Sequence, residues 1–126
     1  MKTLDKLNET KNSVETSTNY LRDICYGLAV DAGWHSKARE IGTMLALIHS
    51  EVSEALEGAR KDLMDDHLPH RKMLEVELAD AVIRIMDLAG KYKLDIGGAI
   101  VEKLIYNTNR DDHKLENREK AGGKSF

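Results

Sequence analysis

The sequence predicts an all-α protein, organised as one domain with a four-helix bundle-like fold. Apolar residues recur at helical spacing through several long segments, and no segment alternates over enough residues to form a strand. The chain has one proline in 126 residues, so little interrupts these helices. At 14.2 kDa it is too small for two independent cores. Short connections between the segments are typical of a bundle, and we expect residues 1–126 to form a single domain.

The first third of the chain contains an arm and the first helix. Residues 1–18 are polar and predict a loose N-terminal arm or a short surface helix. The first helix is expected from Asn19 to near Gly33, a residue type that commonly ends helices. Trp34 and His35 then lie in a connection, and Ser36 is a plausible N-cap for the next helix.

The second helix is expected from about Lys37 to Asp62. Its predicted packing face consists of Ile41, Leu45, Ile48, Val52, Leu56 and Ala59. Residues 63–71 include the only proline and predict a loop.

Two more helices and a tail follow that loop. The third helix should run from about His70 to Tyr92, and the fourth from Ile96 to about Asp112 with Asp95 as its N-cap. Residues 113–126 have no apolar periodicity and predict a flexible basic tail.

Composition excludes several classes of protein. The formal net charge is -3, and no basic block precedes the tail, so we expect no nucleic-acid partner. No apolar run approaches the roughly 20 residues needed to cross a bilayer, and the N-terminal residues lack the apolar core of a signal peptide. Cys25 is the only cysteine, which excludes an intrachain disulfide and favours a packed apolar role. We therefore expect a cytoplasmic protein with no membrane partner.

The third helix contains an unusual polar stripe. Between Val76 and Ala89 only four residues are polar, and at helical spacing Glu77, Asp80, Arg84 and Asp87 share one narrow side. The rest of the helix is apolar, which is typical of burial on most sides. Three partner helices leave part of that apolar surface uncovered, so we expect a homo-oligomer.

A second acidic pair suggests what the stripe is for. Glu51 and Glu54 lie three residues apart on the second helix and should face Glu77 and Asp80 if the two long helices are antiparallel. Four converging carboxylates require cations, and oxygen ligands favour Mg²⁺ or Mn²⁺. An isolated Glu-x-x-Glu is more often a solvated face. A di-iron bundle requires Glu-x-x-His, which is absent from the chain.

The fourth helix offers the opposite charge. Lys103, Asn107 and Arg110 share one face, with Tyr106 beside them. This face is either a solvated basic edge or a site that binds phosphates next to a metal cluster.

These motifs together resemble a known family. The pairs in EVSEALEGARK and EVELADAVIRIMDLAG, followed by YNTNRDDHK and a tail containing GGK, are similar to the MazG-like all-α nucleoside triphosphate pyrophosphohydrolases. The resemblance covers about residues 19–112 and is greatest to small single-domain proteins of bacteria and phages. It implies the MazG fold.

The resemblance also implies a reaction. Members hydrolyse (d)NTPs to a nucleoside monophosphate and pyrophosphate, for nucleotide-pool control or house-cleaning. On this basis Glu51, Glu54, Glu77 and Asp80 would bind two or three Mg²⁺, with Mn²⁺ as a possible substitute. Either Glu51 or Glu54 would activate the attacking water. Lys103, Asn107, Arg110 and Tyr106 would bind the substrate, with Lys103 and Arg110 neutralising the pyrophosphate.

Several alternatives stay open at this point. Trp34 either stacks on the base, with Arg39 and Tyr106 nearby, or caps the bundle. Arg84 and Asp87 either pair with each other, or Asp87 orders a metal-bound water. The oligomer is a dimer or a tetramer. Rival functions are a dimeric dUTPase-like or phosphoribosyl-ATP pyrophosphohydrolase, and a noncatalytic helical interaction module.

The tail suggests one more hypothesis. Arg118, Lys120 and Lys124 could form a flap over the triphosphate, with Gly122 and Gly123 as its hinge.

Overall fold

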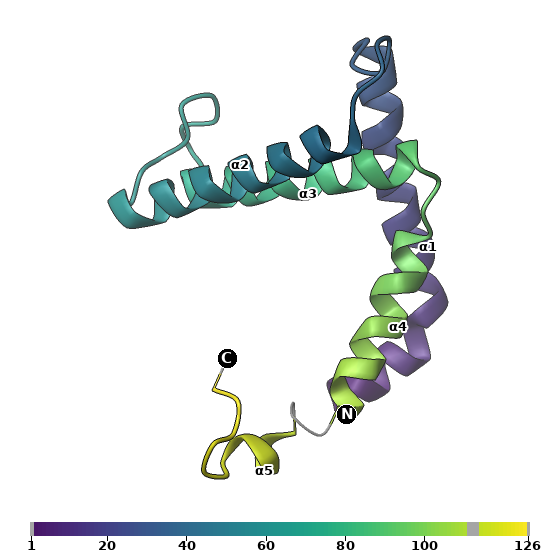
Figure 1. The fold of residues 1–126 in the computed structure, drawn as a ribbon, viewed down its shortest axis with the longest axis vertical. Helices are drawn as coiled ribbons and strands as arrows, with labels where there is room; N and C mark the ends of the chain where they lie inside the picture. Colours follow the sequence, from purple (N-terminus) through teal and green to yellow (C-terminus); the bar gives the residue numbers. More distant parts are fainter. Residues whose placement is uncertain (1, 111–113, 126) are drawn as a thin grey trace. The chain divides into compact units, whose positions relative to one another are not determined.

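The structure is a computed structural model that describes residues 2–110 and 114–125 (Figure 1). It is all-helical, and these residues contain no strand. The described helices are α1 (Thr3–Asp31), α2 (Ile41–Lys61), α3 (Met73–Lys91), α4 (Ile96–Asn109) and α5 (Leu115–Arg118). No helix among the described residues is long and apolar enough to cross a membrane.

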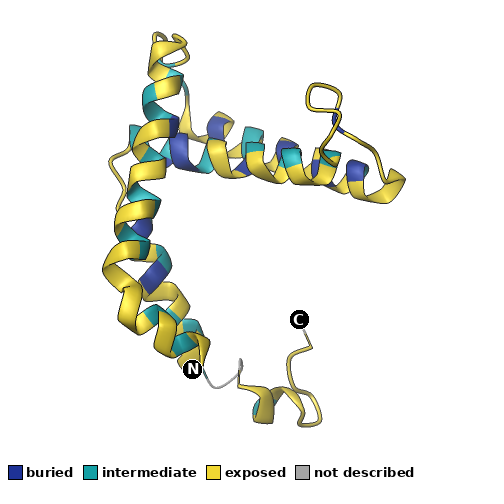
Figure 2. Cartoon of the chain, turned by 180° about the vertical axis from the view of Figure 1, so that it is seen from behind, coloured by how far each residue is buried: buried dark blue, intermediate teal, exposed yellow. Residues whose placement is uncertain are grey.

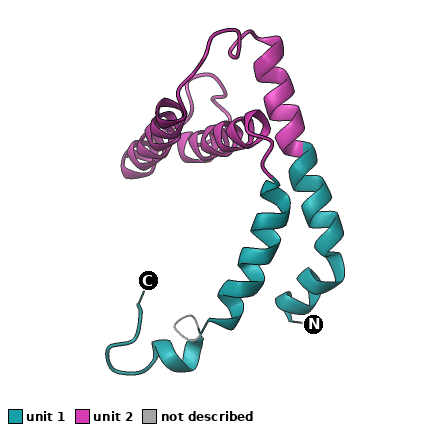
Figure 3. Ribbon diagram, turned by 45° about the vertical axis from the view of Figure 1, so that its right-hand side comes forward, with its two compact units in different colours: residues 1–20, 95–126 teal, residues 21–94 magenta. Residues whose placement is uncertain are grey.

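The chain divides into two compact units, which are coloured in Figure 3. One unit contains residues 1–20 and 95–126, with α4, α5 and the first part of α1. The other contains residues 21–94, with the rest of α1 and the whole of α2 and α3. Both acidic pairs belong to the second unit.

Helix α1 starts earlier than the sequence predicted. It begins at Thr3 rather than at Asn19, so residues 3–18 are helical and do not form a loose arm. Leu4, Leu7 and Val14 are half-buried along it and provide a sparse apolar stripe. The backbone is non-helical at Thr10, whose hydroxyl donates to the Lys6 carbonyl at 2.6 Å. Such a bond competes with the helical hydrogen bonds and bends the helix.

The predicted end of the first helix near Gly33 is confirmed. Gly33 has a φ of +83° and follows the last helical residue by two positions. Its amide donates to the Val30 carbonyl at 2.9 Å, and the Trp34 amide donates to the Ala29 carbonyl at 3.0 Å. These two bonds form a Schellman cap, which needs a left-handed residue.

The predicted N-cap of the second helix is wrong. The Ser36 hydroxyl donates to the Gly33 carbonyl at 2.8 Å, so it belongs to the turn that follows α1. Helix α2 begins at Ile41, with Glu40 as an N-cap that makes no side-chain hydrogen bond.

Helices α2 and α3 lie side by side and antiparallel (Figure 1). Few side chains separate them, because the buried residues of α2 include Ala55 and Gly58. A Cβ at Gly58 would lie 2.8 Å from Cγ of Met73, so only glycine permits this approach. The close contact brings the middle of α2, with Glu51, onto α3.

The predicted packing face of α2 is largely not buried within the chain. Of its large residues, only Ile48 is half-buried, and the others are 45 to 58% exposed: Ile41, Leu45, Val52 and Leu56. The buried side instead contains Met44, Glu51, Ala55 and Gly58. Figure 2 shows how much of both helices is exposed. The large apolar face therefore points away from α3, because small residues allow the closer contact on the other side.

The loop between α2 and α3 is tied together by Asp65. This residue is 6% exposed, and its Oδ2 accepts from the amides of His67 and Leu68 at 3.0 and 2.8 Å. One isolated antiparallel bridge joins Met64 to Lys72. The segment is a loop as predicted, and α3 lies within its predicted range.

Asp95 is the N-cap of α4, as predicted. Its Oδ1 accepts from the amide of Gly98 at 2.9 Å, and the Asn19 side chain donates to the same oxygen at 2.9 Å. The carbonyl oxygen of the Asn19 side chain accepts from the amide of Gly97 at 2.8 Å. The α-helix ends at Asn109, and the predicted end at Asp112 lies outside the described residues.

Candidate functional site

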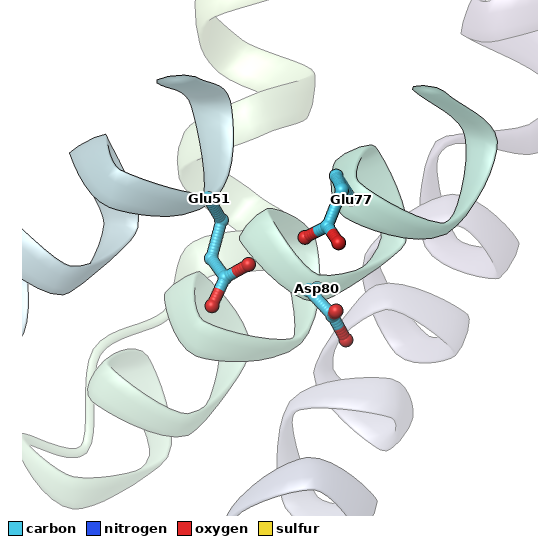
Figure 4. Close-up of side chains that lie close together, drawn as sticks. All are labelled: Glu51, Glu77 and Asp80. Atoms are coloured by element: carbon cyan, nitrogen blue, oxygen red, sulfur yellow. The ribbon is translucent and has the colours of Figure 1, made fainter. Parts of the chain in front are cut away.

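Three carboxylates gather between α2 and α3. Figure 4 shows Glu51 on α2 facing Glu77 and Asp80 on α3. One oxygen of each lies within 4.8 Å of the others. Glu77 and Asp80 are three residues apart and therefore share a face of α3, while the contact at Gly58 brings Glu51 to them. Three of the four predicted metal ligands are thus brought together.

An arginine holds Glu51 inside this cluster. Glu51 is 9% exposed, and Nε of Arg84 donates to its Oε1 at 2.9 Å. Burial by itself raises the pKa of Glu51. Hydrogen bonding with Glu77, Arg84 and Glu54, together with the Arg84 charge, outweighs burial and lowers the pKa below its ordinary value. Glu51 is therefore more acidic than an ordinary glutamate.

Glu77 has the opposite behaviour. Burial, and then the neighbouring Glu51 and Glu54, raise its pKa to about 8. Its Oε2 is buried and has no hydrogen-bond partner among the described residues. The pKa of Asp80 is also raised, by burial and then by the charge of Glu51. Arg84 supplies one positive charge beside three carboxyl groups, and a hard divalent cation would supply more.

Glu54 lies beside the cluster rather than in it. Its side chain influences the pKa of both Glu51 and Glu77, so the carboxyl groups are close. It is exposed, however, and does not belong to the group of oxygens within 4.8 Å. The prediction of four converging carboxylates thus becomes three in close contact and one at the edge.

A cavity of about 780 Å³ opens next to the carboxylates. Glu51, Asp80 and Arg84 line it on the side of the cluster, and Trp34 and Arg39 line it from the connection between α1 and α2. The other lining residues are Leu21, Ile24, Cys25, Leu28, Ala29, Leu47, Ile83 and Asp87. This volume is within the range of small-molecule sites, and its walls combine apolar surface with both signs of charge.

The structure resolves the unexplained half of the polar stripe. Arg84 bonds to Glu51 and not to Asp87, so the alternative in which Arg84 and Asp87 pair with each other is wrong. Asp87 is 9% exposed, and its Oδ1 lies 2.7 Å from Nε2 of His35. No role was predicted for His35 from the sequence, because 52 positions separate the two residues. No sequence signal pointed to His35, because Arg84 and Lys91 are the cationic neighbours of Asp87 on its own helix.

Trp34 is one of the residues that line the cavity. Its side chain is 64% exposed, and the guanidinium carbon of Arg39 lies 6.0 Å from the centre of its ring. Its exposure does not fit a cap buried on the bundle core, and its role in base stacking stays a prediction.

The predicted substrate-binding residues of α4 do share a face. Nζ of Lys103 lies 4.6 Å from the ring centre of Tyr106, and the guanidinium carbon of Arg110 lies 6.0 Å from it. Oδ1 of Asn107 is buried without a hydrogen-bond partner among the described residues. This face belongs to the other unit, so its approach to the carboxylates stays a prediction.

The tail folds back on itself at its end. Arg118 donates from Nε to the Lys124 carbonyl at 3.0 Å and from Nη2 to the Ser125 carbonyl at 2.8 Å. Gly122 has a φ of +78°, which suits the turn between them. In this arrangement Arg118 holds the tail rather than extending from it as a flap.

Comparison of the chain with protein-family models, with curated proteins and with solved structures finds no match.

Proposed function

We propose that this chain is a Mg²⁺-dependent nucleoside triphosphate pyrophosphohydrolase of the MazG-like type. It would cleave a (d)NTP to a nucleoside monophosphate and pyrophosphate, and so control or clean the nucleotide pool. One observation carries the proposal: Glu51, Glu77 and Asp80 present oxygens within 4.8 Å of one another, and two of them, Glu51 and Asp80, line a cavity of about 780 Å³. A cation site beside a nucleotide-sized cavity is what metal-assisted phosphate chemistry requires.

The residues of the cluster fit a magnesium ion. All three donors are carboxylates, which Mg²⁺ and Mn²⁺ prefer, and Oε2 of Glu77 is buried without a partner among the described residues. Glu51, Glu77 and Asp80 would hold the metal, with Glu54 completing the set when it turns inward. Bound there, Mg²⁺ would neutralise phosphate charge and lower the pKa of a coordinated water.

Glu54 is the better candidate for the base that accepts the proton of the attacking water. Glu51 is already bonded to Arg84 at 2.9 Å, which fixes its orientation and weakens it as a base. Glu54 is exposed at the edge of the same cluster and keeps a free approach to water. Lys103 and Arg110 would then neutralise the leaving pyrophosphate.

The cavity would receive the base and sugar. Trp34 lines the cavity with an exposed aromatic ring, and the guanidinium carbon of Arg39 lies 6.0 Å from the centre of that ring. A base inserted there would stack on the indole while apolar residues of α1 enclose the sugar. Arg84 lines the same cavity and would donate to a phosphate oxygen.

A second copy of the chain would cover the apolar face of α2. Ile41, Leu45, Val52 and Leu56 share that face and are each 45 to 58% exposed. Leu74, Leu78 and Val82 of α3 are 38 to 48% exposed. Apolar faces of this extent on paired helices are typical of a bundle completed by another copy.

The test is a panel of the four canonical dNTPs, the four NTPs and dUTP with Mg²⁺, in which pyrophosphate and orthophosphate are measured separately. We expect a monophosphate and pyrophosphate in equal amounts, and no product when EDTA replaces Mg²⁺. Cleavage restricted to dUTP would favour a dUTPase-like enzyme, and adding phosphoribosyl-ATP tests the other narrow relative. Release of orthophosphate, or no turnover of any nucleotide, would contradict the proposal.

A further inference from the structure

The connection between α1 and α2 is attached to α3 at two places. Nε2 of His35 lies 2.7 Å from Oδ1 of Asp87, and Nζ of Lys91 donates to the carbonyl of Arg39 at 3.1 Å. Asp87 and Lys91 are four residues apart and therefore lie on one face of α3. The connection carries Trp34 and Arg39, the two residues that it contributes to the cavity.

The first attachment is well shielded from water. The side chains of His35 and Asp87 are 10% and 12% exposed, and the ring of Tyr26 lies 5.1 Å from that of His35. Tyr26 reaches this position because α3 has a glycine opposite it, and a Cβ at Gly90 would overlap the Tyr26 side chain. A hydrogen bond to a charged group in such a setting is stronger than one at the surface.

The nearest arginine on α3 is not a partner of Asp87. Arg84, one turn away on α3, donates to Glu51 instead. A carboxylate can only accept, so His35 must donate from Nε2, which fixes its tautomer when the ring is neutral. Losing either partner would leave the other buried without its bond.

The bond also restrains Trp34 directly. Trp34 immediately precedes His35, and its amide is held by the Ala29 carbonyl at 3.0 Å in the cap of α1. Arg39 follows four positions after His35 and contacts the same indole ring. Fixing His35 on α3 therefore fixes the part of the connection between the cap and the second attachment.

We infer that His35 and Asp87 are a positioning pair, which holds Trp34 and Arg39 against the cavity so that they can bind the base of the substrate. Neither residue is needed for the phosphate chemistry at Glu51, Glu77 and Asp80. The part of this inference that concerns substrate rests on the proposed function, whereas the restraint on Trp34 does not.

The restraint is tested without substrate, since Trp34 is the only tryptophan of the chain. Time-resolved fluorescence anisotropy of the full-length protein measures how freely its indole moves. We expect the fast-decaying fraction to rise in His35→Ala and in Asp87→Ala, and to rise no further in the double variant, because each change removes the same bond. In Asp87→Asn the fast-decaying fraction should rise less, since the amide oxygen of the new side chain still accepts from His35.

The control removes a different ion pair of the same unit. Arg71 and Glu75 are exposed and bonded at 2.9 Å, so Glu75→Ala should leave the motion of Trp34 unchanged. Circular dichroism checks that each variant is folded, and the isosteric Asp87→Asn keeps the test decisive if Asp87→Ala does not fold. Unchanged anisotropy in the folded variants, or effects that add in the double variant, would overturn the inference.

Kinetics test the consequence for substrate. For the dNTP that the wild type cleaves fastest among dATP, dCTP, dGTP and dTTP, His35→Ala should raise KM about tenfold and leave kcat within about twofold. A merely destabilised enzyme would lose kcat through a smaller active fraction. An active wild type with unchanged KM in this variant overturns the role in base binding and leaves the proposed function standing. An inactive wild type overturns the proposed function, and the anisotropy still decides whether the pair restrains Trp34.

Discussion

The two long faces of α2 differ in chemistry and in burial. The face toward α3 contains Glu51, Ala55 and Gly58, and all three are buried. The face built from Ile41, Leu45, Val52 and Leu56 is apolar, yet these side chains are 45 to 58% exposed. Within one helix, a carboxylate and two small residues are buried beside Met44, whereas four large apolar residues of the other face are exposed.

This difference in burial indicates a separate role for each face of α2. Glycine and alanine let two helices approach closely, and that closeness is what brings the carboxylates of different helices within 4.8 Å. A face of large apolar residues contributes most when another surface covers it. The inner face therefore suits a functional site, while the outer face suits association.

The largest effect is expected on kcat, when a carboxylate of the inner face is replaced by its neutral amide. Glu51→Gln, Glu77→Gln and Asp80→Asn should each lower kcat at least about a hundredfold, because they remove ligand charge from the proposed metal site. The matched control is Glu57→Gln on the same helix, where Glu57 bonds only to the exposed Lys61 among the described residues. Steady-state assays of pyrophosphate release measure the difference, and near-normal turnover in the three variants would contradict the assignment.

The next effect concerns the outer face. Leu56→Lys places a charge on the most exposed large residue of this apolar face and should convert the proposed homo-oligomer to a monomer at micromolar concentration. Ser53→Lys adds the same charge to a polar, exposed part of α2 and should leave the assembly intact. Light scattering coupled to size exclusion measures both variants. A wild type that is itself monomeric would remove the association role of this face.

The smallest effect is a dependence of melting temperature on pH and Mg²⁺. The pKa of Glu77 is raised to about 8, so the folded protein holds this proton more tightly than the unfolded chain. Stability without metal should therefore fall as pH rises from about 4.5 to about 8. Mg²⁺ should raise the melting temperature by several degrees at pH 8 and by less at pH 5, because protons compete for the same oxygens.

Thermal denaturation with and without Mg²⁺ at both pH values gives this comparison. Glu77→Gln removes the titrating group and should flatten the decline of the metal-free protein. If adding Mg²⁺ at pH 8 leaves the melting temperature unchanged, the result would argue for the rival function, a noncatalytic helical module.

The sequence by itself determined the helical class, most helix boundaries and the candidate ligands. Gly33, Asp95 and the segment around Pro69 mark ends, caps and loops through local backbone chemistry, which neighbouring residues decide. The spacing of Glu77 and Asp80 places them on one face in any α-helix. These features needed no knowledge of distant contacts.

Only the tertiary structure decided which face of α2 is buried. It also decided which residues form hydrogen bonds with Arg84 and Asp87 of the polar stripe on α3. Periodicity identifies an apolar face, but it does not say whether another helix of the same chain or a separate surface covers that face. The Gly58–Met73 contact settles this for α2. The pairs Arg84–Glu51 and His35–Asp87 join residues 33 and 52 positions apart, so only the packed helices determine which charges meet.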